Sequence, residues 1–209
     1  FWCSLTMPAL PCPPSPSANR CLSRSDEVAN TIEATGLYRE VREMIKGDIT
    51  LDVRNGKFSF RVGAIIIDSN NILMAKDKKT SFYYTIGGRV RFGETAKEAI
   101  LREIYEETQL RLEVGGLKFV HENFFTSYDH TVYHEICFFY SVKPSAELRN
   151  MKKHSFEESY GEVTLHWLPI DRLATLNIYP EFFKTEPLDS DGQIKCFITK
   201  NNHTFSVTD

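Results

Sequence analysis

An uninterrupted apolar run, GAIIID at positions 63–68, constrains the fold more than any other feature of the sequence. A strand at a surface alternates apolar and polar side chains, whereas a continuous apolar run is typical of a strand covered on both faces. The segment ILMA at 72–75 follows after a turn at Ser69-Asn70-Asn71 and has the same character. We therefore expect a buried sheet with further layers packed on both sides.

The rest of the chain supplies more strands and few helices. Strand-like segments occur at 83–86, 117–125, 132–142 and 163–170. Helical spacing of apolar residues occurs at 96–108, and we expect a second helix near 171–185. A mixed sheet with these two helices predicts an α+β fold, arranged as an α/β/α sandwich.

A hairpin signal stands at the start of this region. Asn55 and Gly56 separate two segments of alternating apolar and polar residues, 49–53 and 58–62. Both residue types tolerate positive φ, so the pair is a strong signal for a two-residue hairpin turn. We expect Asn55 and Gly56 at the centre of that turn.

The composition divides the chain near residue 45. Residues 1–45 begin with a stretch rich in proline, serine and cysteine, which buries too little apolar surface to offset the entropy of ordering. Met44 stands just before the first strand signal, which leaves open whether this leader and linker belong to the native protein. Residues 46–209 carry the strand and helix signals, and we expect them to form one domain.

Charge and cysteine content exclude several classes of partner. The net charge is −3 and the pI about 6.1, so no basic field indicates binding to nucleic acid or to an anionic membrane. The five cysteines form no C-x-x-C pair, which argues against a zinc ribbon and a disulfide scaffold. No apolar run approaches the roughly 18 residues of a membrane span. We expect a soluble protein, cytoplasmic and without a membrane partner.

The helix at 96–108 has a defined start. Thr95 and Glu98 have the spacing of a capping box, so the helix should begin at Ala96. The buried stripe of this helix should consist of Ala96, Ala99, Ile100 and Ile104.

Three glutamates, Glu103, Glu106 and Glu107, fall within about one turn near the end of this helix. Like charges at these spacings cost roughly 0.2–0.5 kcal/mol per pair, and the helix dipole disfavours anions at this end. Arg102 supplies too little positive charge to neutralise them. Carboxylate oxygens without neighbouring histidine or cysteine favour Mg²⁺ or Mn²⁺ over zinc. The sequence therefore predicts a divalent cation among the three glutamates.

A loop of glycine and arginine precedes the helix. Gly87 and Gly88 end a strand, and Arg89 and Arg91 follow. Backbone without Cβ lets a ligand approach closely, and guanidinium groups bind phosphate oxygens. Such a loop suits a pyrophosphate, provided that the glutamate oxygens lie near the glycine turn.

Together these residues resemble the Nudix box, G-x5-E-x7-R-E-U-x-E-E-x-G-U, in which U is aliphatic. The matching residues within 88–110 are Gly88, Glu94, Arg102, Glu103, Ile104, Glu106, Glu107 and Leu110. The match departs where Gln109 replaces the last glycine, a helix-ending position at which glutamine costs on the order of 1 kcal/mol. The resemblance implies the Nudix fold and the Nudix hydrolase superfamily for the domain at 46–209.

The resemblance also implies an activity. Members of this family hydrolyse a nucleoside diphosphate linked to another moiety, such as ADP-ribose, a dinucleotide, a nucleotide sugar or a modified nucleoside triphosphate, with Mg²⁺ as cofactor. By this analogy the catalytic and metal-holding residues are Glu103, Glu106 and Glu107, and Glu103 also orients or deprotonates the attacking water. The carbonyl group of Gly87 is a further metal ligand in this analogy. Structural support falls to Gly88 and to an ion pair between Glu94 and Arg102.

Family members often add a carboxylate from a distant loop. We assign Glu162 to the metal and Glu158 to the substrate, and leave Glu157 open. The alternative for each is a solvated acidic loop.

The substrate pocket is less defined. We expect substrate contacts from Arg61, Arg89 and Arg91, and aromatic stacking from a subset of the residues at 82–84 and 121–128. Strand alternation must turn about half of those residues away from a pocket. His134 and Glu135 match no metal motif and receive no catalytic role.

Three interpretations remain. The first is a Nudix pyrophosphohydrolase acting on a small nucleotide. The second is a non-catalytic Nudix module that binds a nucleotide and regulates a partner, although such modules tend to lose the glutamates that this chain retains. In the third, REIYEE is an ordinary solvated helix face. The sequence identifies neither the leaving group of the substrate nor whether the protein forms a homodimer.

Overall fold

The computed structural model describes residues 47–78, 80–127, 129–150, 155–158, 161–188, 192–200 and 203–207. All of them belong to one of the two units into which the chain divides, Ile45–Asp209. The predicted leader and linker lie outside the described residues, so the boundary near residue 45 stays a prediction.

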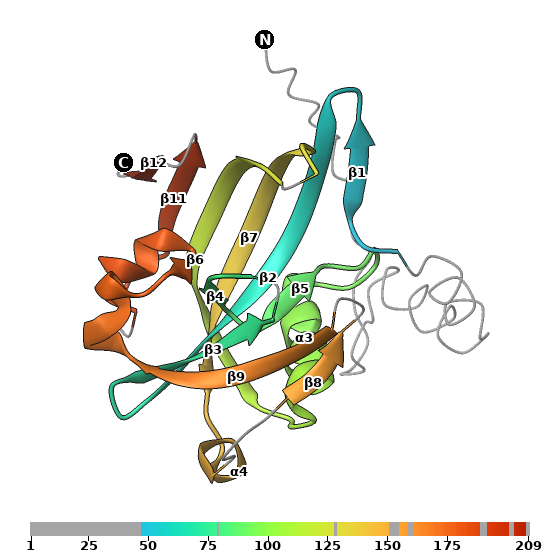
Figure 1. Ribbon diagram of the computed structural model, residues 1–209. Coiled ribbons are helices and arrows are strands. Elements are labelled where there is room, and N and C mark those ends of the chain that lie inside the picture. Colours follow the sequence, from blue (N-terminus) through green and yellow to red (C-terminus); the bar gives the residue numbers. More distant parts are fainter. Residues whose placement is uncertain are drawn as a thin grey trace, which may run out of the picture. The chain divides into compact units, whose positions relative to one another are not determined.

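The described residues form one mixed sheet of twelve strands with little helix (Figure 1). The strands are β1 (Thr50–Val53), β2 (Gly56–Asp68), β3 (Asn71–Asp77), β4 (Tyr83–Tyr84), β5 (Gly87–Arg89), β6 (Glu113–Thr126), β7 (Val132–Lys143), β8 (Ser155–Glu158), β9 (Gly161–Pro169), β10 (Ile178–Tyr179), β11 (Lys195–Lys200) and β12 (His203–Val207). The helices are α3 (Ala96–Thr108) and α4 (Ala146–Asn150), with 3-10 segments η1 (Ile170–Thr175) and η2 (Glu181–Lys184). Within the described ranges, no helix has the length and apolar character needed to span a membrane.

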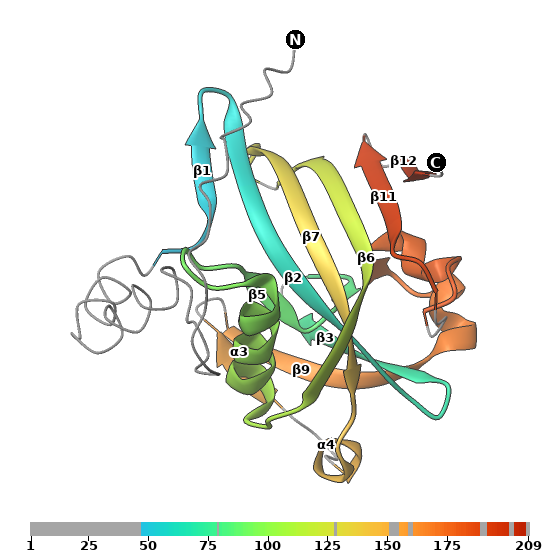
Figure 2. The same ribbon diagram turned by 180° about the vertical axis from the view of Figure 1, so that it is seen from behind.

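Strand β2 organises the sheet because it pairs along its length of 13 residues. It runs antiparallel to β1, β5 and β3, and parallel to β7. The sheet continues from β7 through β6 and β11 to β12. Figures 1 and 2 show β2, β7 and β6 side by side as the longest part of the sheet. The predicted α+β class is confirmed.

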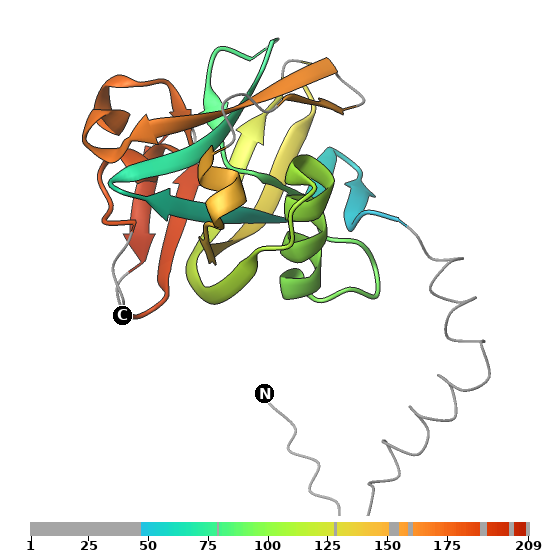
Figure 3. The same ribbon diagram turned by 90° about the horizontal axis from the view of Figure 1, so that it is seen from below.

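Two apolar cores lie on the two faces of this sheet. The first contains Ala99, Ile100 and Ile104 of α3 with Val62, Ala64 and Ile66 of β2. The second contains Leu173, Phe182 and Phe183 with Ile65 of β2. Successive strand residues point to opposite faces, so the apolar run at 63–68 serves both cores. In Figure 3, α3 and the segment at 170–184 lie well apart.

The prediction of a continuous second helix near 171–185 is wrong. The two 3-10 segments flank β10, which pairs in parallel with β4. Strand pairing holds Ile178 and Tyr179 extended, and Pro180 has no N–H to donate within a helix. The apolar side chains of this segment, Leu173, Phe182 and Phe183, are buried from two separate short turns.

The predicted hairpin forms, but its turn lies one residue earlier than expected. Val53 pairs with Gly56, so the two residues between them make the turn. Gly56 is needed for another reason, since a Cβ there would lie 2.4 Å from the carbonyl oxygen of Val132. Positive φ occurs instead at Ser69 (47°) and Asn70 (65°), in the predicted turn between β2 and β3.

Candidate functional site

Helix α3 begins and ends where the sequence predicts. Thr95 Oγ1 accepts a hydrogen bond from Glu98 N at 3.2 Å, and Glu98 Oε2 accepts one from Thr95 N at 2.7 Å. Gln109 closes the helix in the left-handed conformation, at φ 60° and ψ 15°. Its side-chain amide donates to the carbonyl oxygens of Tyr105 and Glu106 at 3.1 and 3.2 Å. The glutamine therefore offsets its backbone strain by satisfying helix-end carbonyls.

Glu107 connects the end of α3 to β5. It is 4% exposed, and its Oε1 accepts a hydrogen bond from Gly87 N at 3.0 Å. Gly87 has a φ of 150°, and a Cβ there would lie 2.1 Å from the carbonyl oxygen of Val62. Only glycine fits at this position, where β5 pairs closely with β2.

Glu103 lies directly against the backbone of Gly88. A Cβ on Gly88 would lie 2.3 Å from Glu103 Oε1 and 2.5 Å from Oε2. The missing side chain therefore makes room for the carboxylate. Burial raises the pKa of Glu103, and the hydrogen bond from Arg102 opposes this rise.

The Arg102 guanidinium joins α3 to the loop before it. Its Nη2 donates to Glu94 Oε1 at 2.6 Å and to the carbonyl oxygen of Arg89 at 3.0 Å, while Nε donates to Glu94 Oε2 at 3.1 Å. Burial acts to raise the pKa of Glu94, but the hydrogen bonds from Arg102 and from Arg91 N outweigh it and hold that pKa below its usual value. This bidentate pair fixes the loop against the helix.

The remaining nitrogen of Arg102, Nη1, is shared by two glutamates. It donates to Glu103 Oε1 at 2.5 Å and to Glu106 Oε2 at 3.1 Å. Glu106 also accepts from Arg91 Nη2 at 3.4 Å. The carboxylates of Glu103 and Glu106 thus already share one positively charged group, the Arg102 guanidinium.

The carboxylates fit a hard divalent cation in their chemistry, because every donor is an oxygen and one positive group already lies among them. Across the described ranges, however, no three histidine, cysteine, aspartate or glutamate side chains are gathered closely enough to hold a metal ion. Glu103 and Glu106 meet at Arg102, and Glu107 is turned toward Gly87. Binding a cation at this point therefore requires these side chains to turn toward one another.

The three predicted substrate arginines lie on β5, on the loop after it and on the neighbouring strand β2. Arg91, on the loop after β5, contacts Glu106, and Arg89, the last residue of β5, has its Nη1 3.7 Å from Asp48 Oδ2. Arg61 of β2 pairs in register with Arg89 and lines the cleft described below.

The structure does not bring Glu162, the predicted downstream metal ligand, to this group. Glu162 forms an ion pair with Lys78 Nζ at 2.6 Å. Alternation along β9 turns it away from Leu165 and Trp167, which pack on the core that contains α3. The side chain of Glu158 lies outside the described part of the chain, so its substrate role stays a prediction.

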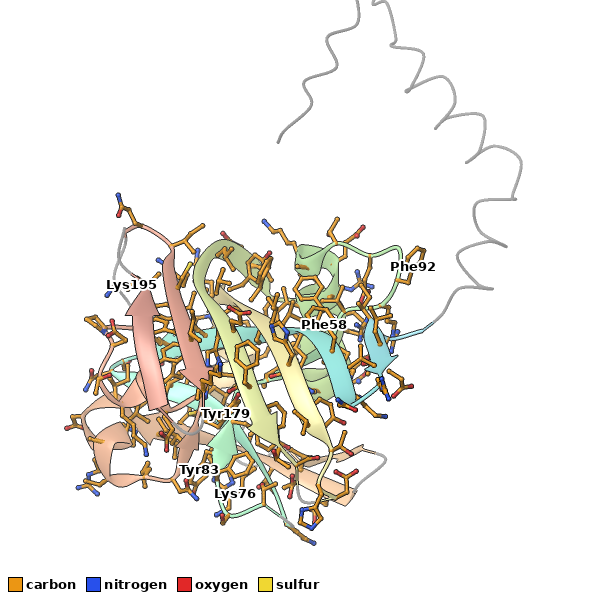
Figure 4. All side chains as sticks on the ribbon, turned by 90° about the horizontal axis from the view of Figure 1, so that it is seen from above. Phe58, Lys76, Tyr83, Phe92, Tyr179 and Lys195 are labelled. Carbon is orange, nitrogen blue, oxygen red and sulfur yellow. The ribbon has the colours of Figure 1, made fainter. Side chains whose placement is uncertain are left out.

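A cleft of 620 Å³ borders the glutamate group, since Gly87 forms part of its wall. A volume of this size suits a small-molecule ligand. Its aromatic lining residues are Phe82, Tyr84, Phe125, Phe139 and Tyr179. Figure 4 shows Tyr179, from β10, near the ends of the central strands. Of the predicted pocket residues, Phe82, Tyr84, Asn123 and Phe125 line the cleft, Tyr83 and Phe124 do not, and Tyr128 lies outside the described residues.

Sequence reasoning missed Glu135, which lines this cleft. It is 8% exposed, and its Oε2 lies 3.8 Å from Arg61 Nε. Burial raises the pKa of Glu135, and the charge of Arg61 opposes the rise. The available signal was alternation along β7, which puts this one acidic residue on the same face as Cys137 and Phe139.

The sequence matches the NUDIX domain family over residues 57–186, which is more than half of the chain. No curated protein matches it significantly. A MutT protein from Bacillus halodurans is similar in structure, with a TM-score of 0.50 and 19% identity over 69% of this chain and 92% of the other. A MutT protein from methicillin-resistant Staphylococcus aureus 252 is 32% identical, with a TM-score of 0.43 over 62% and 92%. An ADP-ribose pyrophosphatase from Streptococcus suis is 14% identical, with a TM-score of 0.39 over 61% and 83%.

Proposed function

Because the chain belongs to the Nudix superfamily, we propose that it hydrolyses the diphosphate bridge of a nucleoside diphosphate linked to another moiety, with Mg²⁺ or Mn²⁺ as cofactor. Substrates of this class include ADP-ribose, dinucleotides, nucleotide sugars and modified nucleoside triphosphates. The observation that carries the proposal is the convergence of Glu103 and Glu107 on Gly87 and Gly88 at the wall of the cleft.

In this proposal Glu103, Glu106 and Glu107 hold the cation, together with the carbonyl group of Gly87. When bound, the cation lowers the pKa of a water molecule and neutralises charge on phosphate oxygens. Arg102 would stay anchored if Glu103 and Glu106 turned to the cation, because its Nε and Nη2 are bonded to Glu94. The ion pair with Glu94 thus keeps the helix and the loop aligned.

The other residues position the reactants. Arg89, at the end of β5, and Arg91, on the loop after it, bind phosphate oxygens. Glu103, held against the backbone of β5, accepts the proton of the attacking water. Gly87 lies between the carboxylates and the cleft, so the phosphates lie beside it and the nucleoside occupies the cleft.

The test is product analysis with a panel of nucleoside diphosphate derivatives, with Mg²⁺ and with a chelator. We expect metal-dependent hydrolysis, and Glu106→Gln should lower turnover on the order of hundredfold while the protein stays folded. Glu113→Gln is the matched control, because this exposed glutamate contacts Lys143 and none of the proposed site residues in the described part of the chain. Metal-independent turnover would overturn the proposal. Nucleotide binding without any hydrolysis would favour the non-catalytic module instead.

A further inference from the structure

A row of four polar residues crosses the sheet, and three of them, Glu135, Asn123 and Thr199, line the cleft. Glu135 of β7 lies opposite Asn123 of β6, and the register continues the row to Ser59 of β2 and Thr199 of β11. Ser59, Asn123 and Glu135 are exposed by 1%, 2% and 8%. A sheet face that packs only on an apolar core has apolar side chains at such positions. The row therefore indicates a polar ligand.

The protein itself leaves this row incompletely bonded. Among the described residues, Ser59 Oγ is buried without a hydrogen-bond partner. Glu135 has its ion pair with Arg61, but at 3.8 Å that contact is too long for a hydrogen bond. A buried polar group without a partner is unfavourable, and a buried carboxylate more so. Such groups are expected where a ligand completes the hydrogen bonds.

The donors and acceptors of this row restrict the ligand. The Asn123 amide nitrogen donates one of its two hydrogens to the Tyr179 hydroxyl, which orients the amide, and Asn123 Oδ1 is an acceptor that a ligand can use. With the two oxygens of Glu135 this makes three acceptors, and Arg61 supplies the donor. A matching base needs adjacent N–H donors beside one carbonyl oxygen. Guanine has this arrangement in N1–H, the N2 amino group and O6.

The other purines match less well. Adenine places an unprotonated ring nitrogen, itself an acceptor, beside its amino group, so it would face the Glu135 carboxylate with a lone pair. Hypoxanthine retains N1–H and O6 but lacks the N2 amino group, which would leave one of the three acceptors unpaired.

We propose that Glu135 and Asn123 are specificity-determining residues that select a guanine base in the cleft. The Glu135 carboxylate accepts from N1–H and the amino group, Asn123 Oδ1 accepts the second amino hydrogen, and Arg61 donates to O6. The aromatic rings of Phe82, Tyr84 and Phe125 supply stacking surfaces. This inference rests on the proposed function only in taking the ligand to be a nucleotide.

The test measures binding of GMP, IMP and AMP to the full chain by isothermal titration calorimetry in the presence of a chelator. We expect GMP to bind at least about tenfold more tightly than IMP and AMP, because each loses a paired donor. Equal affinities, within about twofold, would overturn the inference. The comparison of ligands needs no variant, so it does not depend on a mutant that folds.

Glu135→Gln tests the residue itself, since it replaces one acceptor with a donor at nearly constant size. We expect GMP affinity to fall about tenfold or more and the preference over IMP to disappear. Glu122→Gln is the matched control, because this glutamate lies next to Asn123 in β6 but faces the opposite side and contacts His134 at 2.8 Å. A preference that survives Glu135→Gln would exclude Glu135 as the selecting residue.

The two proposals fail separately. Selective GMP binding without hydrolysis of any substrate would refute the hydrolase and leave the base selection intact. Metal-dependent hydrolysis with equal binding of the three nucleotides would refute the base selection alone.

Discussion

A methyl group added at Gly88 tests whether the carboxylate of Glu103 must lie against β5. The new Cβ would lie 2.3–2.5 Å from the carboxyl atoms of Glu103. Because these atoms end a flexible side chain, Glu103 can rotate away at the cost of an unfavourable rotamer, about 0.5–1.5 kcal/mol. We expect Gly88→Ala to lower the free energy of unfolding by about 1 kcal/mol and, by displacing a catalytic carboxylate, to lower turnover on the order of hundredfold.

Gly87→Ala is the matched contrast one residue earlier. Its Cβ would lie 2.1 Å from the carbonyl oxygen of Val62, and its φ of 150° disfavours any residue with a side chain. Neither backbone can move cheaply, and strain and overpacking each cost about 1–3 kcal/mol. We expect the free energy of unfolding to fall by roughly 3 kcal/mol or more.

Urea unfolding and steady-state turnover, measured on both variants, separate the two effects. Gly88→Ala should lose activity with its fold nearly intact, and Gly87→Ala should lose the fold. The reasoning is refuted if Gly88→Ala unfolds as readily as Gly87→Ala, or if it keeps the turnover of the unmodified protein.

Three further changes have defined outcomes. Gln109→Gly relieves backbone strain on the order of 1 kcal/mol but removes two exposed side-chain hydrogen bonds. Urea titration should therefore show a change in the free energy of unfolding below about 1 kcal/mol, and marked destabilisation would contradict this. Arg102→Lys keeps the charge, but a lysine cannot bridge both oxygens of Glu94. We expect the free energy of unfolding to fall by about 2 kcal/mol, and an unchanged value would contradict this role of Arg102. Burial lowers the pKa of His121 from 6.5 to about 4, so the unfolded chain binds the proton more readily. The contribution of His121 to the free energy of unfolding should be fully present above pH 6.5 and should be lost as the pH falls toward 4, by roughly 3 kcal/mol in all. His121→Gln should remove this dependence of the free energy of unfolding on pH.

Local chemistry makes α3 predictable from the sequence. The Thr95 and Glu98 cap and the closing Gln109 depend on residues within four positions of one another. The same holds for the glutamates, whose helical spacing fixes which of them approach Arg102. The apolar run at 63–68 is equally informative, because burial on both faces leaves a strand no polar positions.

The features that could not be predicted from the sequence depend on contacts between segments far apart in the chain. Gly56 is needed because Val132, far along the chain, comes close to it, and pairing with β4 holds Ile178 and Tyr179 extended. Alternation shows that Glu135 shares a face with Cys137 and Phe139. It does not show that this face is open to a cleft, which depends on where the segment at 177–181 returns.

The groups proposed to act on the diphosphate come from one short stretch of chain, Gly87 to Glu107, whereas the cleft takes most of its lining from β2, β6, β7, β11 and residues 82–85 and 177–181, and shares only Gly87 with that stretch. Substitutions in the lining other than at Gly87 therefore leave the residues of the hydrolytic stretch unchanged. Over evolutionary time such a chain exchanges one nucleotide for another while inheriting its chemistry unchanged. A designer seeking a new preference would accordingly randomise the inward positions of those strands and keep the stretch from Gly87 to Glu107 constant.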